Sequence, residues 1–223
     1  MAERHEEKYL IDYRQYAQLK ARANQVLNPD PHGQNGSYTI TSLYYDDFKN
    51  TALLEKQDGL SVHTKFRLRT YDGNADLIRL ERKVKQGVMT KKQSAMIQPE
   101  QLTFLGMPGW DLSRLPAEAQ PLALQMLSGG MRPATAIRYR RDAFLFPGTD
   151  LRLTFDTSLE ILPADPASLF QTDRMGIPVL DGNTVIMEIK YNTHLPAFVR
   201  QLTAISAQAL SVSKYALCRE TFL

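Results

Sequence analysis

The stretch SVHTKFRLRTY, residues 61–71, decides how this sequence is interpreted. Successive side chains of a β-strand point to opposite faces, so the residues of a strand separate with period two. One face of this stretch carries apolar side chains at positions 62, 66 and 68. The other face carries His63, Lys65, Arg67 and Arg69 and no acid. The stretch therefore predicts an amphipathic strand with one apolar and one basic face.

Other runs along the chain show the same alternation. Residues 4–11, 76–84, 150–157 and 184–191 each place apolar side chains on one face and mostly charged ones on the other. The polar positions are Arg4, Glu6 and Lys8, then Arg79, Glu81 and Lys83, then Arg152, Thr154 and Asp156, and finally Glu188 and Lys190. These runs predict amphipathic strands whose polar faces are dominated by cations, with a few carboxylates.

Turn residues and hydrophobic periodicity place the remaining elements. Further strands are expected at 37–46, 87–97, 134–146 and 158–162, and the proline-rich segment 163–183 is expected to be irregular. Helices are expected at 12–27, around 98–105 and 116–127, and from Pro196 to about residue 210. In the first helix Asp12 is the expected N-cap, and the buried stripe is Tyr16, Leu19, Ala23 and either Val26 or Leu27.

About eight strands with short connections predict an α+β fold. We expect an antiparallel eight-stranded closed β-barrel, or tunnel, with helices packed outside. No linker divides the sequence, so residues 1–223 are expected to form a single domain with a helical insertion at about 98–131.

Composition excludes several classes of protein. The 223 residues carry a formal net charge of +3, which is too small to argue for nucleic-acid binding, and the single cysteine excludes a disulfide scaffold. The four histidines have no metal-site spacing. No apolar run is long enough to span a membrane, and the charged start MAERHEEKYLID is not a signal peptide. We therefore expect a cytoplasmic protein.

The basic strand faces have two interpretations. Long charged side chains are usually exposed, so the faces can simply be solvated. However, the cations of 61–71 repel one another, and amphipathic helices are available to cover the apolar faces instead. The charged faces would then line a basic lumen, which requires a polyanionic ligand such as a phosphate chain.

Eight short motifs are spread along the sequence: RHEEKYLID, SLYYDD, KFRLRTY, LERK, IRYRRDAF, LRLTFDT, VIMEIKY and SVSKY. In order and spacing they resemble the VTC domain, the polyphosphate polymerase domain of the triphosphate tunnel metalloenzyme superfamily. The resemblance covers roughly residues 3–217. It implies an antiparallel eight-stranded tunnel lined by Lys, Arg and Glu, in agreement with the strand pattern.

The resemblance also implies roles for individual residues. Lys91 matches the lysine of the strand after Lys83, with Lys92 as the alternative if the register slips by one. Ser211 replaces a second lysine one turn before Lys214, and Arg4 replaces one carboxylate of the hydrolytic tunnel enzymes. The catalytic set is Lys8, Arg67, Arg69, Lys83, Arg141, Arg152 and Lys214; Lys91 and Lys190 join these as phosphate contacts, and Glu188 and Glu6 are the metal ligands. For Glu81 a salt bridge to its neighbouring cations is favoured, whereas for Glu6 both roles stay open.

The function implied by the resemblance is phosphoryl transfer. The γ-phosphate of a nucleoside triphosphate would move onto a polyphosphate chain inside a basic tunnel, with Mn²⁺ or Mg²⁺ as cofactor. The alternatives are an inorganic triphosphatase or polyphosphatase, and a non-catalytic polyphosphate-binding module attached to a membrane partner. The expected partners are nucleoside triphosphate, polyphosphate or pyrophosphate and a membrane protein in trans, which would hold the chain at the inner face of the membrane; no nucleic acid is expected.

Overall fold

The structure is a computed structural model that describes residues 5–87, 89–105, 110–192, 195–204, 208–209 and 213–221. The chain forms two compact units. Unit 1 contains residues 1–39, 139–159 and 180–211, and unit 2 contains residues 40–138, 160–179 and 212–223. Each unit is therefore assembled from segments that are distant in sequence.

Eight strands of eight or more residues and three strands of two residues occur in the described part of the chain. The long strands are β1 (His5–Asp12), β3 (Ser37–Asp46), β4 (Val62–Tyr71), β5 (Ile78–Gln86), β6 (Met89–Ile97), β7 (Arg132–Leu145), β8 (Arg152–Leu162) and β10 (Thr184–Tyr191). The short strands are β2 (Asn28–Pro29), β9 (Ile177–Pro178) and β11 (Gln208–Ala209). The strand pairs within each unit are antiparallel, which confirms the expected strand-rich antiparallel fold with helices.

The helices are short except for the first. They are α1 (Tyr13–Val26), α2 (Thr51–Gln57), α3 (Gln120–Ser128), α4 (Ala197–Leu202) and α5 (Lys214–Glu220), with 3-10 turns η1 (Ala75–Leu77), η2 (Pro99–Phe104), η3 (Leu112–Arg114) and η4 (Pro166–Leu169). The expected helical insertion is thus η2, η3 and α3. No described helix is long and apolar enough to cross a lipid bilayer.

In unit 1, helices cover the apolar face of the sheet. Strand β1 pairs with β11 and β10, and β10 pairs with β8. Asp12 is the N-cap of helix α1, and its carboxylate accepts a hydrogen bond from the backbone N–H of Gln15 at 2.7 Å. Its buried stripe packs with Val199 and Leu202 of α4 on the apolar side chains of these strands. As expected, the stripe includes Tyr16, Leu19 and Ala23; it ends with Leu27, whereas Val26 is exposed.

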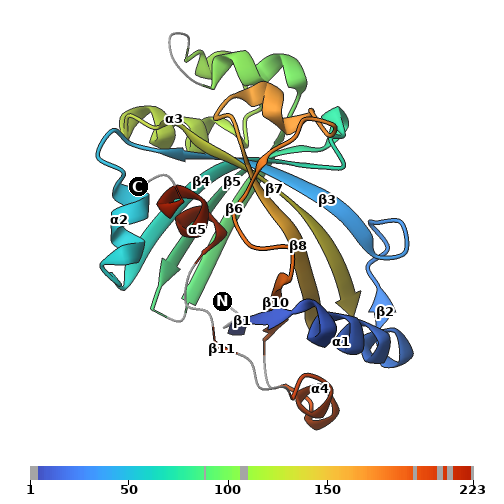
Figure 1. Cartoon of the computed structure of the whole chain (residues 1–223). Coiled ribbons are helices and arrows are strands. Elements are labelled where there is room, and N and C mark those ends of the chain that lie inside the picture. The colour runs from blue at the N-terminus through green and yellow to red at the C-terminus, as the bar shows by residue number, and fades with distance from the viewer. Residues whose placement is uncertain are drawn as a thin grey trace. The chain divides into compact units, whose positions relative to one another are not determined.

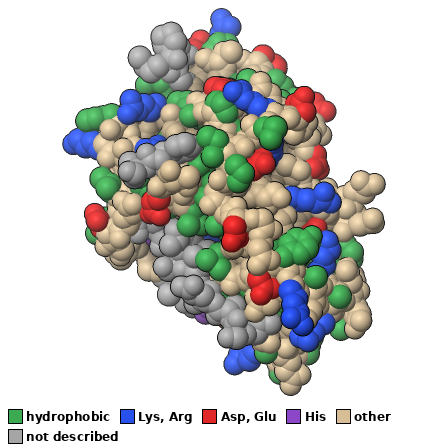
Figure 2. Space-filling model, in the orientation of Figure 1, with side chains coloured by type: hydrophobic (Ala, Val, Ile, Leu, Met, Phe, Trp, Pro, Cys, Tyr) green, Lys and Arg blue, Asp and Glu red, His purple; other side chains and the backbone are tan. Residues whose placement is uncertain are grey.

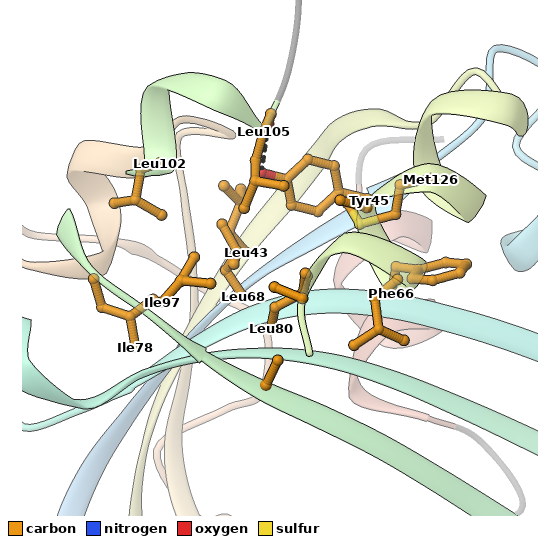
Figure 3. Close-up of a cluster of buried hydrophobic side chains, with 14 of the residues drawn as sticks. Leu43, Tyr45, Phe66, Leu68, Ile78, Leu80, Ile97, Leu102, Leu105 and Met126 are labelled. Atoms are coloured by element: carbon orange, nitrogen blue, oxygen red, sulfur yellow. Dashed lines mark hydrogen bonds between the residues drawn. The ribbon is translucent and has the colours of Figure 1, made fainter. Parts of the chain in front are cut away.

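In unit 2, β4 lies between β3 and β5, and β5 pairs with β6 (Figure 1). The apolar face of this sheet packs against η2, η3 and α3. Figure 3 shows the centre of this core, where leucines of β3, β4 and β5 meet Leu102, Leu105 and Met126. The Tyr45 hydroxyl donates to the Leu105 carbonyl at 3.2 Å, which fixes the insertion to the sheet.

Two elements differ from the sequence-based expectation. The helix that begins after Pro196 ends at Leu202, where the Thr203 hydroxyl donates to the carbonyl of Val199. Farther along, Gln208 and Ala209 pair with β1 instead of continuing the helix, because the edge of β1 offers unpaired backbone groups. Strand β8 also continues through Ser158, which adopts a positive φ of 52°, and so joins two strands that were expected to be separate.

Candidate functional site

The polar face of the unit 1 sheet lies opposite the face covered by α1 and α4. Strand register places Lys8 opposite Glu188, Glu188 opposite Thr154, and Lys190 opposite both Glu6 and Arg152. Arg141 reaches this face from β7. We call the following set the mixed cluster: Glu6, Lys8, Arg141, Arg152, Asp156, Glu188 and Lys190.

Glu188 is the centre of the mixed cluster and is only 3% exposed. Its carboxylate lies 2.9 Å from the Lys190 ammonium, 3.7 Å from the Arg141 guanidinium and 3.8 Å from the Lys8 ammonium. Burial would raise the pKa of Glu188, but the cations outweigh burial and hold it well below its usual range. Glu188 is therefore a buried carboxylate that stays charged.

The other cations of the mixed cluster are also matched by carboxylates. Arg141 binds Asp156 through two parallel hydrogen bonds of 2.6 and 2.7 Å, the bidentate geometry typical of guanidinium and carboxylate. Arg152 donates to Asp30 at 2.5 Å, and Asp30 comes from the loop before β3. Lys8 lies 2.7 Å from Glu6. The cluster is thus close to charge balance.

The polar face of the unit 2 sheet has a different composition. Register places Arg69 opposite Arg79, Arg67 opposite Glu81, and Lys83 opposite both Lys65 and Lys92. We call this set the basic cluster: Lys65, Arg67, Arg69, Arg79, Glu81, Lys83 and Lys92. Glu81 is the one carboxylate among these seven residues, so cations dominate the face.

Glu81 is 1% exposed and holds the basic cluster together. It accepts hydrogen bonds from Arg67, with both Nε and Nη2 at 2.7 Å, and it also pairs with Lys92. Burial opposes its ionisation, but Arg67, Arg69 and Lys92 lower the pKa of Glu81 to about 2. A salt-bridging role, as the sequence favoured, agrees with these contacts.

Neutral side chains of β3 hold two further cations of the basic cluster. Arg69, 7% exposed, donates from Nε to the Ser42 hydroxyl at 3.0 Å. Arg67 donates to the Tyr44 hydroxyl at 3.0 Å. Although burial opposes it, the positive charge of Arg67, Arg69 and Lys65 lowers the pKa of the Tyr44 phenol to about 8. Tyr44 was not among the site residues selected from the sequence.

The N-terminal end of α5 also lies against the unit 2 face. Lys65 donates to the Ser213 hydroxyl at 2.8 Å, and Ser213 caps α5, which begins at Lys214. The Tyr215 ring of the same helix packs against Tyr44 at a tilt of 32°, with ring centroids 5.1 Å apart. The structure therefore brings Ser213 and Tyr215 of the SVSKY motif to strands β4 and β3.

The register places the two candidate lysines of β6 on opposite faces of the sheet. Lys92 lies opposite Lys83, on the face of Glu81, whereas Lys91 lies opposite Val84 on the other face. Lys92 and not Lys91 therefore shares the face of the basic cluster, because one residue of register moves a side chain to the opposite face of a sheet. Arg4 and Ser211 lie outside the described residues.

Several charged side chains of these clusters are buried, unlike the charged side chains of a solvated surface. On the face of the molecule shown in Figure 2, Lys and Arg side chains are interspersed with Asp and Glu. In contrast, Arg69, Glu81, Arg141, Asp156 and Glu188 are all buried. The interpretation of a simply solvated charged face does not account for buried cations and carboxylates.

The carboxylates of the described residues can hold a divalent cation only if a bound phosphate group supplies further ligands. No group of three or more His, Cys, Asp or Glu side chains that could hold a metal occurs among the described residues. Glu188 and Glu6 interact with each other and share Lys8, so two carboxylates are available on β10 and β1. Hard cations accept carboxylate and phosphate oxygens together, so phosphate oxygens would complete such a site.

Comparison with protein families gives a match that spans almost the whole sequence, since the model of the VTC domain matches residues 3–223. The chain belongs to the VTC domain family. The eight ordered motifs agree with this assignment. Comparison with curated protein sequences gave no significant match.

Solved structures of low sequence identity share the fold. HpAC1 from Hippeastrum, whose structure is described as revealing a dominant triphosphatase activity, has a TM-score of 0.59 at 16% identity and covers 100% of this chain and 97% of its own. The PH1819 protein of Pyrococcus horikoshii gives 0.52 at 10% identity, with 97% and 96% covered. A Bacillus halodurans protein named provisionally as an adenylate cyclase gives 0.51 at 15% identity, with 93% and 92% covered.

Proposed function

We propose that this chain is a metal-dependent phosphotransferase that extends polyphosphate at the expense of a nucleoside triphosphate. The observation that carries the proposal is the set of six cations that the register of β4, β5 and β6 places on one face, around the buried carboxylate of Glu81. A phosphate chain is attracted by such a face and accepts charge-assisted hydrogen bonds from Arg and Lys. Membership of the VTC domain family supports the same substrate class.

In this proposal the basic cluster binds the length of the phosphate chain, and the mixed cluster binds phosphate and metal. Arg67, Arg69, Lys83 and Lys92 bind its oxygens and spread the charge of the transferred γ-phosphoryl group. Arg141 and Lys190 neutralise the negative charge of the phosphate oxygens that lie near Glu188. A divalent cation, Mn²⁺ or Mg²⁺, held by Glu188 and Glu6, would supply further positive charge at the phosphate oxygens.

The reaction is an in-line displacement. An oxygen of the terminal phosphate of the growing chain attacks the γ-phosphorus, and the bond to the nucleoside diphosphate breaks. The products are a chain one unit longer and a nucleoside diphosphate. Such reactions need little covalent participation by protein groups, so positioning and charge neutralisation provide most of the rate. The proposal includes a cytoplasmic setting and a membrane protein in trans, since export of the product needs another chain.

One assay tests the reaction type. The protein is incubated with ATP and Mn²⁺, and ADP, free phosphate and chain length are measured together. The proposal expects ADP with long chains and little free phosphate. Free phosphate without chains would replace it with a triphosphatase, as described for HpAC1. Binding of ATP without turnover would identify a polyphosphate-binding module.

A further inference from the structure

One buried hydroxyl next to Glu188 lacks a hydrogen-bond partner. Thr154 is 1% exposed, and its Oγ1 contacts no donor or acceptor within hydrogen-bond distance among the described residues. Register places it on β8 directly opposite Glu188, with Arg152 and Asp156 two residues away on the same face. A buried polar group without a partner destabilises a fold, so it calls for an explanation.

The carboxylates around Thr154 already have cationic partners. Asp156 accepts both hydrogen bonds of Arg141, and Glu188 is paired with Lys190 at 2.9 Å. Neither carboxylate accepts the Thr154 proton. The hydroxyl thus keeps a free donor on the same face as Arg152 and Lys190, two cations that are expected phosphate contacts.

We propose that the Thr154 hydroxyl donates a hydrogen bond to an oxygen of the bound phosphate chain. This inference rests on the proposed function, because it assumes that a triphosphate binds at the mixed cluster. It adds a neutral contact to a site otherwise made of charged groups. The ligand-free protein would carry the unsatisfied hydroxyl, and binding would satisfy it.

The expected signature is a variant that is more stable alone and binds more weakly. Thr154→Val keeps the β-branched shape that suits a strand and removes only the hydroxyl. Without ligand its Tm should rise by about 2–4 °C, because the unsatisfied group is gone. Its affinity for inorganic tripolyphosphate should fall about ten-fold or more, as expected for a lost hydrogen bond to a charged acceptor. Thr154→Ser should bind nearly as well as the unaltered protein.

Thr70 provides the matched control. It is also a fully buried threonine on a strand, but its hydroxyl donates to the Leu169 carbonyl at 2.7 Å. Thr70→Val should therefore lower the Tm and leave tripolyphosphate affinity unchanged. The two valine variants should thus shift the Tm in opposite directions, and only Thr154→Val should lower the affinity.

The experiment measures Tm and tripolyphosphate affinity by calorimetry in EDTA, and then affinity again with Mn²⁺. If the unaltered protein does not bind tripolyphosphate under either condition, the proposed function itself fails. If it binds and Thr154→Val binds equally well, the role of Thr154 is wrong. A lower Tm for Thr154→Val would show that the Thr154 hydroxyl has a hydrogen-bond partner in the ligand-free protein, which contradicts the proposal. A loss of affinity seen only with Mn²⁺ overturns the phosphate contact, because the hydroxyl then serves the metal.

Discussion

The two clusters of charged side chains are built on similar strands but differ in charge. In the mixed cluster, Arg141 is matched by Asp156, Arg152 by Asp30, and Lys190 by Glu188. In the basic cluster, Glu81 is shared by Arg67 and Lys92, and further cations follow on the same strands. The first cluster can therefore be stable without a ligand, whereas the second gains most from a polyanion.

This difference suggests a division of tasks. A carboxylate-rich cluster suits a divalent cation and the reacting phosphates, while a cation-rich one suits the length of a phosphate chain. The excess of cations over acids is thus large in the basic cluster and small in the mixed one. The following predictions test this division, beginning with the largest expected effect.

Glu188→Gln should abolish Mn²⁺-dependent turnover. The amide keeps the size of the side chain but removes the charge that a divalent cation needs. Metal-free triphosphate binding should stay the same or become tighter, because a negative charge near phosphate is lost. ADP release and metal-free ATP binding are measured on the same variant. Glu7→Gln is the control, since Glu7 lies on the other face of β1 and accepts hydrogen bonds from Tyr9 and Tyr191. Retained turnover in Glu188→Gln would contradict its role as metal ligand.

Arg69→Ala should weaken triphosphate binding by roughly ten-fold to more than a hundred-fold, the value of one charge-assisted hydrogen bond. The fold should survive, because Arg69 binds a neutral hydroxyl, Ser42, and faces Arg79. Calorimetry with triphosphate measures the effect. Arg140→Ala removes the same charge from an exposed position that contacts Ser37. If both variants lose the same affinity, the effect is one of net charge and not of the basic cluster.

Glu81→Gln should destabilise the ligand-free protein by roughly 3 kcal/mol, because Arg67 and Lys92 lose their buried counter-charge. Added tripolyphosphate should restore much of this stability. Denaturant unfolding with and without tripolyphosphate measures both effects. An equal loss of stability in the presence of ligand would show that no polyanion replaces the charge of Glu81.

The pH dependence of stability follows from the same residue. The pKa of Glu81 is lowered to about 2 in the folded protein, below the value of about 4.3 for an unfolded chain. The folded state thus gains stability from ionised Glu81 above pH ~4.3 and loses it as the pH falls towards 2. Acid unfolding of Glu81→Gln should lack this part of the pH dependence. Identical acid profiles for the two proteins would refute the lowered pKa.

The smallest expected effect is spectroscopic. The pKa of Tyr44 is about 8 because of the cations beside it, so tyrosinate absorbance should appear well below the usual range near 10. The ionised Tyr44 phenolate stabilises the folded state, so its contribution to the free energy of unfolding increases as the pH rises from 8 to 10. Bound triphosphate neutralises Arg67 and Arg69 and should raise this pKa. Tyr44→Phe identifies the signal, and a titration that does not change with ligand would place the phosphate chain away from Tyr44.

Period-two alternation predicted the strands because it depends only on neighbouring residues. The polar faces of β4, β5, β8 and β10 were predicted in this way, the N-cap Asp12 followed from its residue type at the start of a helical pattern, and the order of motifs identified the family. The end of α4 was not predictable, because pairing of Gln208 and Ala209 with β1 joins residues far apart in the sequence.

The sequence by itself determined which side chains share a strand face, and therefore that basic faces exist. Only the tertiary structure decided which carboxylate each cation meets. Asp30 reaches Arg152 from a distant loop, and Lys92 rather than Lys91 reaches Glu81 through the register of β5 and β6. Such partners depend on strand pairing and loop paths, which a local pattern does not encode. For the same reason, the unsatisfied hydroxyl of Thr154 became visible only when β10 and β8 were paired.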